Sequence, residues 1–302
     1  MGRTTTTITE YNMKKYNFIS GLPRSGSTLL SSILNQNPRF TAAISDPLHA
    51  FCHAITREVN SAVGMESTVP KEKQRDLMRG LFDTFYQHNT EVCFNTNRAW
   101  SADTALLKDL YPDFKMIICL RDVEWIIDSF EQLNAKNPYS IKPLYHHQEL
   151  QTVYQRSNML MGMVPNFGGY VEGPLVCAKQ AAFCDERDQI CFVEYDTLVN
   201  NPEDTMRQIY KFLGEPWFDH DFNNVETSYD EFDKQAKIEG LHTIKRKVQQ
   251  YPRRSILPGD LTAQLQQHSF WKTQEFNQVK QQLNWITPNK PIIKRPPILK
   301  QL

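Results

Sequence analysis

The 302-residue sequence has no excess charge of either sign, because its 34 lysines and arginines match its 34 aspartates and glutamates. A general nucleic-acid or membrane surface needs a clear excess of positive charge, so we expect neither nucleic acid nor a membrane among the partners. Any anion must be recognised by a local group of residues. Otherwise the composition, 40% hydrophobic and 23% charged, is that of an ordinary globular protein.

The sequence also lacks long hydrophobic runs. Apolar stretches such as Met116–Leu120 are far too short to cross a bilayer, and no N-terminal stretch joins positive charge to a long apolar segment. The six cysteines are scattered, without a Cys-x-x-Cys pair or a histidine at zinc-finger spacing. We therefore predict a cytoplasmic protein with reduced thiols and no metal site.

One stretch, residues 16–34, organises the chain. An apolar run leads into the loop Gly21-Leu-Pro-Arg-Ser-Gly26, and apolar residues at helical spacing follow it. This order predicts a strand, a phosphate-binding loop and a helix. In such a loop, backbone N–H groups and the positive end of the helix dipole converge on one anion.

The loop lacks the lysine of nucleotide triphosphatases. A Walker A loop has lysine directly after its second glycine, followed by a hydroxyl that holds magnesium. Ser27 occupies the lysine position in this sequence, and the loop's cation is Arg24. We therefore predict a different anion, bound without a metal. From the loop alone, an ordinary glycine-rich turn is the alternative.

The rest of the chain alternates between buried strands and amphipathic helices. The clearest predicted strands are residues 40–44, 91–96, 114–120 and 189–195, and the clearest predicted helices are residues 70–85, 202–213 and 261–283. With no repeat or linker, we predict a disordered segment at residues 1–11, one domain at residues 12–287 and an extended proline-rich tail at residues 288–302.

Polar side chains follow two of these strands, where a doubly wound sheet places its ligand. Asp46, His49 and His53 follow strand 40–44 and are candidates for acid–base chemistry. Arg121 ends strand 114–120, and Ser129 lies ~12 Å further along the next helix, so the two can converge on one phosphate. Taken singly, each of this pair is better explained as a surface residue.

A basic cluster lies near the C-terminal end of the predicted domain. Its five cations are Lys245, Arg246, Lys247, Arg253 and Arg254. The cluster fits either a second anion clamp or a solvated surface.

The loop, the pair Arg121 and Ser129, and the segment Val193–Leu198 together resemble the sulfotransferases that use 3′-phosphoadenosine 5′-phosphosulfate (PAPS). The resemblance covers roughly residues 14–220. The loop wording Pro-Arg-Ser-Gly is closer to the bacterial and protein-tyrosine branches than to the cytosolic small-phenol branch. The resemblance to this family implies a P-loop-type three-layer α/β fold, with a central parallel sheet flanked by helices. It also implies in-line transfer of a sulfuryl group to an acceptor hydroxyl or amine.

The resemblance also implies roles for individual residues. Those implied to bind PAPS are Pro23, Arg24, Ser25, Gly26, Ser27, Thr28, Arg121, Ser129 and Tyr195. Arg24 would neutralise charge as the S–O bond breaks. Arg121 and Ser129 match the pair that grips the 3′-phosphate, and Tyr195 matches the tyrosine near the adenine.

Two parts of the family pattern are missing. Its C-terminal Arg-Lys-Gly signature is absent, so Lys245 and Arg246 are assigned to the cofactor site by charge alone. The catalytic base has no secure match. Asp46 lies nearest the acidic position of the tyrosine-sulfating branch and is favoured over His49, although a histidine is the better base near neutral pH. Asp46 also fits a helix cap.

Other functions fit parts of the pattern. A non-catalytic adenosine-phosphate-binding protein would keep the site without transferring a group. A P-loop nucleotide kinase is disfavoured by the missing lysine. For the acceptor we expect a small molecule, and a peptide also fits.

Overall fold

The structure, a computed structural model, describes residues 14–61, 63–136, 145, 152–162, 169–226, 233–234 and 240–288. The predicted disordered segment at residues 1–11 and the predicted tail beyond residue 288 lie outside the described residues. None of the helices in the described ranges is long and apolar enough to span a bilayer.

Six parallel strands form one sheet in the order β2-β3-β1-β4-β5-β6. The strands are β1 (Lys15–Gly21), β2 (Phe40–Ala42), β3 (Val92–Thr96), β4 (Met116–Leu120), β5 (Ile190–Glu194) and β6 (Asn284–Trp285). The chain builds β2 and β3 on one side of β1 and then crosses to β4 on the other side. This reversal of strand order lies beside the loop after β1, where open α/β sheets bind ligands.

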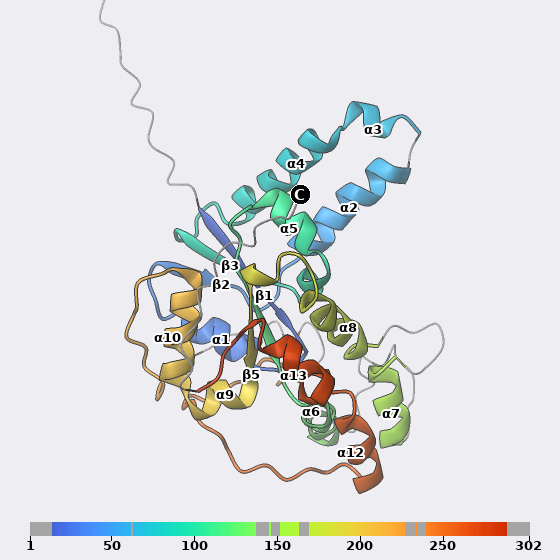
Figure 1. Cartoon of the computed structure of the whole chain (residues 1–302), viewed down its shortest axis with the longest axis vertical. Helices are drawn as coiled ribbons and strands as arrows, with labels where there is room; N and C mark the ends of the chain where they lie inside the picture. The colour runs from blue at the N-terminus through green and yellow to red at the C-terminus, as the bar shows by residue number, and fades with distance from the viewer. Residues whose placement is uncertain are drawn as a thin grey trace, which may run out of the picture.

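Helices cover both faces of the sheet. On one side lie α1 (Ser27–Leu34), α9 (Tyr195–Asn200) and α10 (Pro202–Leu213); on the other lie α6 (Val123–Lys136), α8 (Glu172–Ala181), α12 (Gly259–Gln266) and α13 (Gln274–Lys280) (Figure 1). The pair α2 (Leu48–Ser61) and α4 (Lys71–Phe85) extends beyond the sheet with α3 (Met65–Thr68) at its tip (Figure 1). The remaining elements are η1 (Arg98–Ala102), α5 (Thr104–Leu110), α7 (Val153–Leu160), η3 (Arg187–Gln189) and η4 (Phe270–Lys272).

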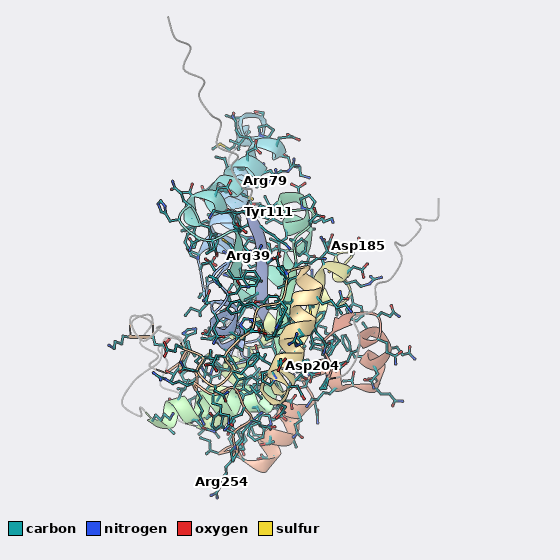
Figure 2. All side chains as sticks on the ribbon, turned by 90° about the vertical axis from the view of Figure 1, so that its left-hand side faces the viewer. Arg39, Arg79, Tyr111, Asp185, Asp204 and Arg254 are labelled. Carbon is teal, nitrogen blue, oxygen red and sulfur yellow. The ribbon has the colours of Figure 1, made fainter. Side chains whose placement is uncertain are left out.

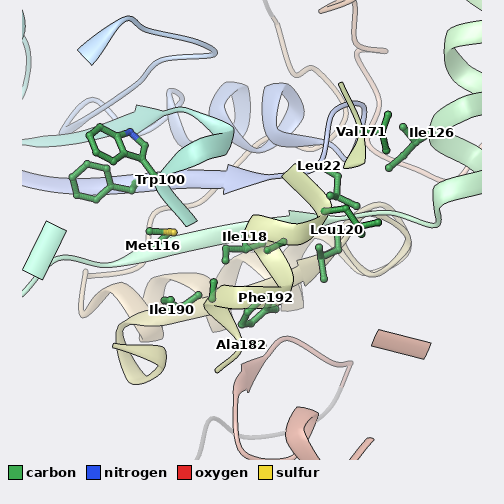
Figure 3. Packing of buried hydrophobic residues seen from close by; sticks show 14 of the residues in the cluster. Leu22, Trp100, Met116, Ile118, Leu120, Ile126, Val171, Ala182, Ile190 and Phe192 are labelled. Atoms are coloured by element: carbon green, nitrogen blue, oxygen red, sulfur yellow. The ribbon is translucent and has the colours of Figure 1, made fainter. Parts of the chain in front are cut away.

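Strand β4 shows why the sheet needs both layers. Its side chains alternate, so Met116, Ile118 and Leu120 join the core on the α6 and α8 side, whereas Ile117 and Cys119 join the core on the α1 and α10 side. All five are buried. The first of these cores extends from Trp100 to Val171 (Figure 3). A strand buried on both faces is a continuous apolar run, as the sequence predicted.

The predicted α/β fold, with a parallel sheet flanked by helices, is confirmed. The predicted single helix over residues 261–283 is wrong. It is divided into α12, η4 and α13, because the side chain of Thr273 accepts a hydrogen bond from the Phe276 N–H and starts a new helix. The helix predicted at residues 70–85 is α4, where the sequence pattern predicts a core stripe of Leu77, Met78, Leu81, Phe82 and Phe85. Met78 and Phe82 are buried, but Leu77 and Phe85 are 49% and 45% exposed, because α4 extends beyond the sheet (Figure 1).

Candidate functional site

The loop between β1 and α1 has the backbone of an anion cradle. Arg24 has a φ of 58°, in the left-handed region that non-glycine residues rarely adopt, and Gly26 has a φ of 96°. A Cβ on Gly26 would lie 2.8 Å from Cδ2 of Tyr195, and one on Gly21 would lie 2.1 Å from the Cys119 carbonyl oxygen. Both glycines are therefore required by close packing as well as by φ.

A cavity of about 950 Å³ opens at the carboxyl ends of the strands. Of the predicted site residues, those lining it are Pro23, Arg24, Gly26, Ser27, Thr28, Arg121, Ser129, Tyr195 and Lys245. Those outside the lining are Ser25, Asp46, His49 and Arg246. The structure thus brings together the loop, the strand-end arginine and the tyrosine, which are up to 171 positions apart in the chain (24 to 195).

Two guanidinium groups meet at the base of this cavity. Nη1 of Arg121 donates to the Arg24 backbone carbonyl over 3.0 Å, and Nε of Arg24 donates to Oγ of Ser129 over 3.0 Å. The Arg121 guanidinium also lies 4.6 Å from the ring centroid of Tyr195. Ser129 therefore contacts Arg24 directly, whereas sequence reasoning paired it with Arg121.

The electrostatics of the pair indicate a missing anion. Burial, followed by repulsion from Arg121, lowers the pKa of Arg24 to about 10. Burial likewise lowers the pKa of Arg121. Both groups stay charged at neutral pH. Nε of Arg121 is buried without a hydrogen-bond partner among the described residues, and such a donor is costly unless a ligand satisfies it.

The segment of residues 240–256, here called the clamp segment, closes one side of the cavity. Buried Asp128 on α6 holds it, because one carboxylate oxygen accepts hydrogen bonds from Ser255 Oγ (3.0 Å) and Ile256 N (2.8 Å). Arg253 pairs with Asp196 and packs its guanidinium 5.5 Å from the ring centroid of Tyr195.

The other cations of the basic cluster differ in position. Lys245, Lys247 and Arg254 line the cavity, and Arg254 also projects outward at one end of the molecule (Figure 2). Arg246 points away, with 75% of its side chain exposed and Glu226 3.6 Å from it. The structure therefore does not bring Arg246 to the cavity.

The two predicted candidates for the base lie elsewhere. Asp46 is 7% exposed, and its carboxylate accepts hydrogen bonds from Leu48 N (3.1 Å), Thr96 N (3.1 Å) and the Tyr86 hydroxyl (3.3 Å). Burial raises its pKa although these hydrogen bonds oppose the shift. The contact with the first N–H of α2 matches the helix-cap alternative. Nε2 of His49 lies 2.7 Å from Asp103 Oδ2. This geometry favours a structural role for Asp46.

Ser25 also turns away from the anion site. Its buried hydroxyl donates to the Leu22 carbonyl over 2.6 Å and so stabilises the loop from within. Its neighbours Ser27 and Thr28 line the cavity.

Sequence reasoning missed a histidine–carboxylate pair in the cavity wall. Nδ1 of His242 lies 2.5 Å from Asp233 Oδ1, and the His242 backbone N–H donates to Asp233 Oδ2 over 2.8 Å. Burial lowers the pKa of His242, and the positive charges of Arg24 and Arg98 lower it further. The hydrogen bond and the charge of Asp233 raise it, but burial is the largest effect. The imidazole is therefore neutral at neutral pH. Nothing in the sequence around Gly240-Leu-His-Thr signals it.

Comparisons with known proteins point to one family. A family model described as "Sulfotransferase family" matches residues 18–219. A protein-tyrosine sulfotransferase of Drosophila melanogaster is 23% identical over 245 residues, which are 77% of this chain and 44% of that protein. The chain therefore spans less than half the length of this curated relative.

Solved structures of sulfotransferases resemble the fold loosely. A sulfotransferase from Alicyclobacillus acidocaldarius has a TM-score of 0.48 at 17% identity, covering 74% of this chain and 89% of that one. A mouse sulfotransferase, SULT7A1, in complex with PAP has a TM-score of 0.47 at 11% identity, covering 89% of both chains.

Proposed function

This chain belongs to the sulfotransferase family, and from that premise we propose that it transfers the sulfuryl group of PAPS to an acceptor hydroxyl or amine by in-line displacement. The observation that carries the proposal is the pair of half-buried arginines at the cavity, Arg24 and Arg121, with one buried and unsatisfied donor atom, Nε, on Arg121. A ligand with two separate anionic groups fits a cavity that has a phosphate loop and a second arginine.

The residues that line the cavity suggest which groups would bind each part of PAPS. The loop N–H groups, Arg24, Ser27 and Thr28 would hold the 5′-phosphosulfate. Arg121 would pair with the 3′-phosphate, because its unsatisfied Nε needs an acceptor oxygen. The ring of Tyr195, held against Gly26, offers a flat surface for the adenine.

The chemistry needs positioning and charge more than a metal. The acceptor oxygen or nitrogen attacks sulfur, the bond from sulfur to the bridging oxygen breaks, and its electron pair stays on the 5′-phosphate of adenosine 3′,5′-bisphosphate. Arg24 would stabilise the charge that develops on that oxygen. Such electrostatic stabilisation carries most of the catalysis in related phosphoryl transfers.

We assign the role of base to His242. Since a carboxylate accepts hydrogen bonds, Nδ1 of His242 would carry the proton toward Asp233 and Nε2 would carry the lone pair. Nε2 is then the atom that takes the proton of the acceptor. The assignment is supported by the position of His242 in the cavity lining and by the influence of the Arg24 charge on its pKa. Asp46 and His49, the candidates from sequence, lie outside the cavity lining.

A transfer assay tests the function. Purified protein is incubated with PAPS carrying a labelled sulfuryl group, with a chelator and with either phenolic small molecules or a tyrosine-containing peptide. We expect label on one acceptor class and release of adenosine 3′,5′-bisphosphate. Phosphate transfer from ATP that requires magnesium would support a kinase, and nucleotide binding without transfer to any acceptor would support a binding protein.

A further inference from the structure

Three metal-ligating side chains meet beside the cavity wall. They are His49 and His53, one helical turn apart on α2, and Asp103, which directly follows η1. Both Nε2 atoms point to the same carboxylate oxygen, Asp103 Oδ2, at 2.7 Å from His49 and 2.9 Å from His53. All three potential ligand atoms lie within 4.8 Å of one another.

The packing around these residues holds them in this arrangement. The ring of His49 packs edge-to-face on buried Trp100, with ring centroids 4.7 Å apart, and 15% of its side chain is exposed. Asp103 occupies the N-cap position of α5, but its carboxylate forms no capping hydrogen bond and turns to the histidines instead. An aspartate at this position usually caps the helix. His53 is half exposed, which leaves a path for a solvated ion.

We propose that His49, His53 and Asp103 bind a divalent transition-metal ion of the zinc type, with water as the fourth ligand. Two imidazole nitrogens and one carboxylate oxygen are a donor set that suits zinc. Ligand atoms around tetrahedral zinc are roughly 3.4 Å apart, given Zn–N and Zn–O bonds of about 2.1 Å. The separations from Asp103, 2.7 Å and 2.9 Å, therefore need to open by about 0.5–0.7 Å, which small side-chain rotations supply.

The ion would connect two parts of the fold that are far apart in the chain. It would tie α2 to the start of α5 and so fix η1, whose first residue, Arg98, lines the cavity. None of the three ligands lines the cavity itself. The ion would therefore have a structural role, and the proposal does not depend on the identity of the sulfuryl donor or of the acceptor.

Calorimetric titration of chelator-treated full-length protein with Zn²⁺ tests the site. Wild-type protein should bind one ion, and binding should raise the unfolding temperature. His53→Ala, at a half-exposed position, should weaken binding by at least ~10–100-fold, the usual loss for groups that only support a metal ligand. Exposed His88, three residues beyond the C-terminal end of α4, provides the control, because His88→Ala should bind like wild-type.

Two further measurements keep the test decisive. Co²⁺ should give the visible absorption of a tetrahedral site in wild-type protein and lose it in Asp103→Asn, which keeps the size of the side chain and removes its charge. Circular dichroism checks that each variant folds. Equal zinc affinity in wild-type and His53→Ala, or no binding to wild-type, would overturn the proposal and leave a purely hydrogen-bonded cluster.

Discussion

The phosphate loop, residues 21–28, and the clamp segment, residues 240–256, face the same cavity but are held in place by different means. The loop is shaped by its own backbone, with two glycines, a left-handed Arg24 and the dipole of α1 behind it. The clamp segment is held by side chains far away in the chain, above all by Asp128. We therefore expect the loop to hold the reacting anion through its backbone and Arg24, and the clamp segment to supply the proposed base, His242.

The largest expected effect concerns His242 in the clamp segment. His242→Gln should lower kcat by ~10²–10⁴-fold, the contribution of a general base, while binding of adenosine 3′,5′-bisphosphate changes little. Steady-state kinetics and calorimetry measure the two. A variant with unchanged kcat would show that the clamp segment has no part in the chemistry.

The pH profile gives an independent readout of the same residue. A base must be neutral, and burial lowers the pKa of His242, so wild-type kcat/KM should stay level down to a pH below about 6.5, the ordinary histidine value, and then fall. Asp233 raises this pKa, so Asp233→Asn should shift the fall to lower pH. A merely structural pair would leave its position unchanged.

The next effect concerns the loop. Arg24→Ala should lower kcat by ~10²–10³-fold, as for other groups that stabilise transition-state charge, with a smaller loss of binding. Arg24→Lys is the matched control: both variants place a Cβ at the same left-handed φ, so backbone strain is shared and the difference between them reports the charge. Equal losses in kcat and binding would mean that the loop only binds the donor.

The smallest effect concerns the attachment of the clamp segment. Asp128→Ala leaves the donors of Ser255 and Ile256 unsatisfied, which should cost about 1–3 kcal/mol of stability. Trypsin should then cut after Arg254 faster than in wild-type protein. Ser255→Ala keeps the hydrogen bond from Ile256 N to Asp128 but also removes the acceptor of Leu257 N, and it should lie in between. Denaturant unfolding and mass spectrometry measure both. Unchanged cleavage would show that other contacts hold the segment.

The same contrast explains what could be predicted from the sequence. The loop, the parallel strands and the cavity positions of Arg24 and Arg121 followed from local patterns, because strand ends meet at one edge of a sheet, whereas Tyr195 was implied by the family resemblance. The pair of Asp233 and His242 could not be predicted, since a histidine in an irregular segment carries no signal until the fold brings its carboxylate beside it.

Asp46, the base favoured from the sequence, shows that a local pattern can also fit two different roles. Asp46 follows a strand, as an active-site residue would, yet a short polar side chain before a helix equally fits a cap. The hydrogen bonds that the Asp46 carboxylate accepts distinguish a structural residue from a catalytic base. Two of their donors, Tyr86 and Thr96, are at least 40 positions away in the chain, so the sequence does not reveal them.

The most direct test of the central claim is calorimetric titration with adenosine 3′,5′-bisphosphate and with AMP, without magnesium. The buried donor of Arg121 predicts that the bisphosphate binds more tightly by about 1.5–3 kcal/mol, the value of a hydrogen bond to a charged group, which is roughly 10–150-fold. Arg121→Ala should remove most of this preference. Equal affinity for the two nucleotides in wild-type protein would contradict the account, because the cavity would then have no site for a 3′-phosphate.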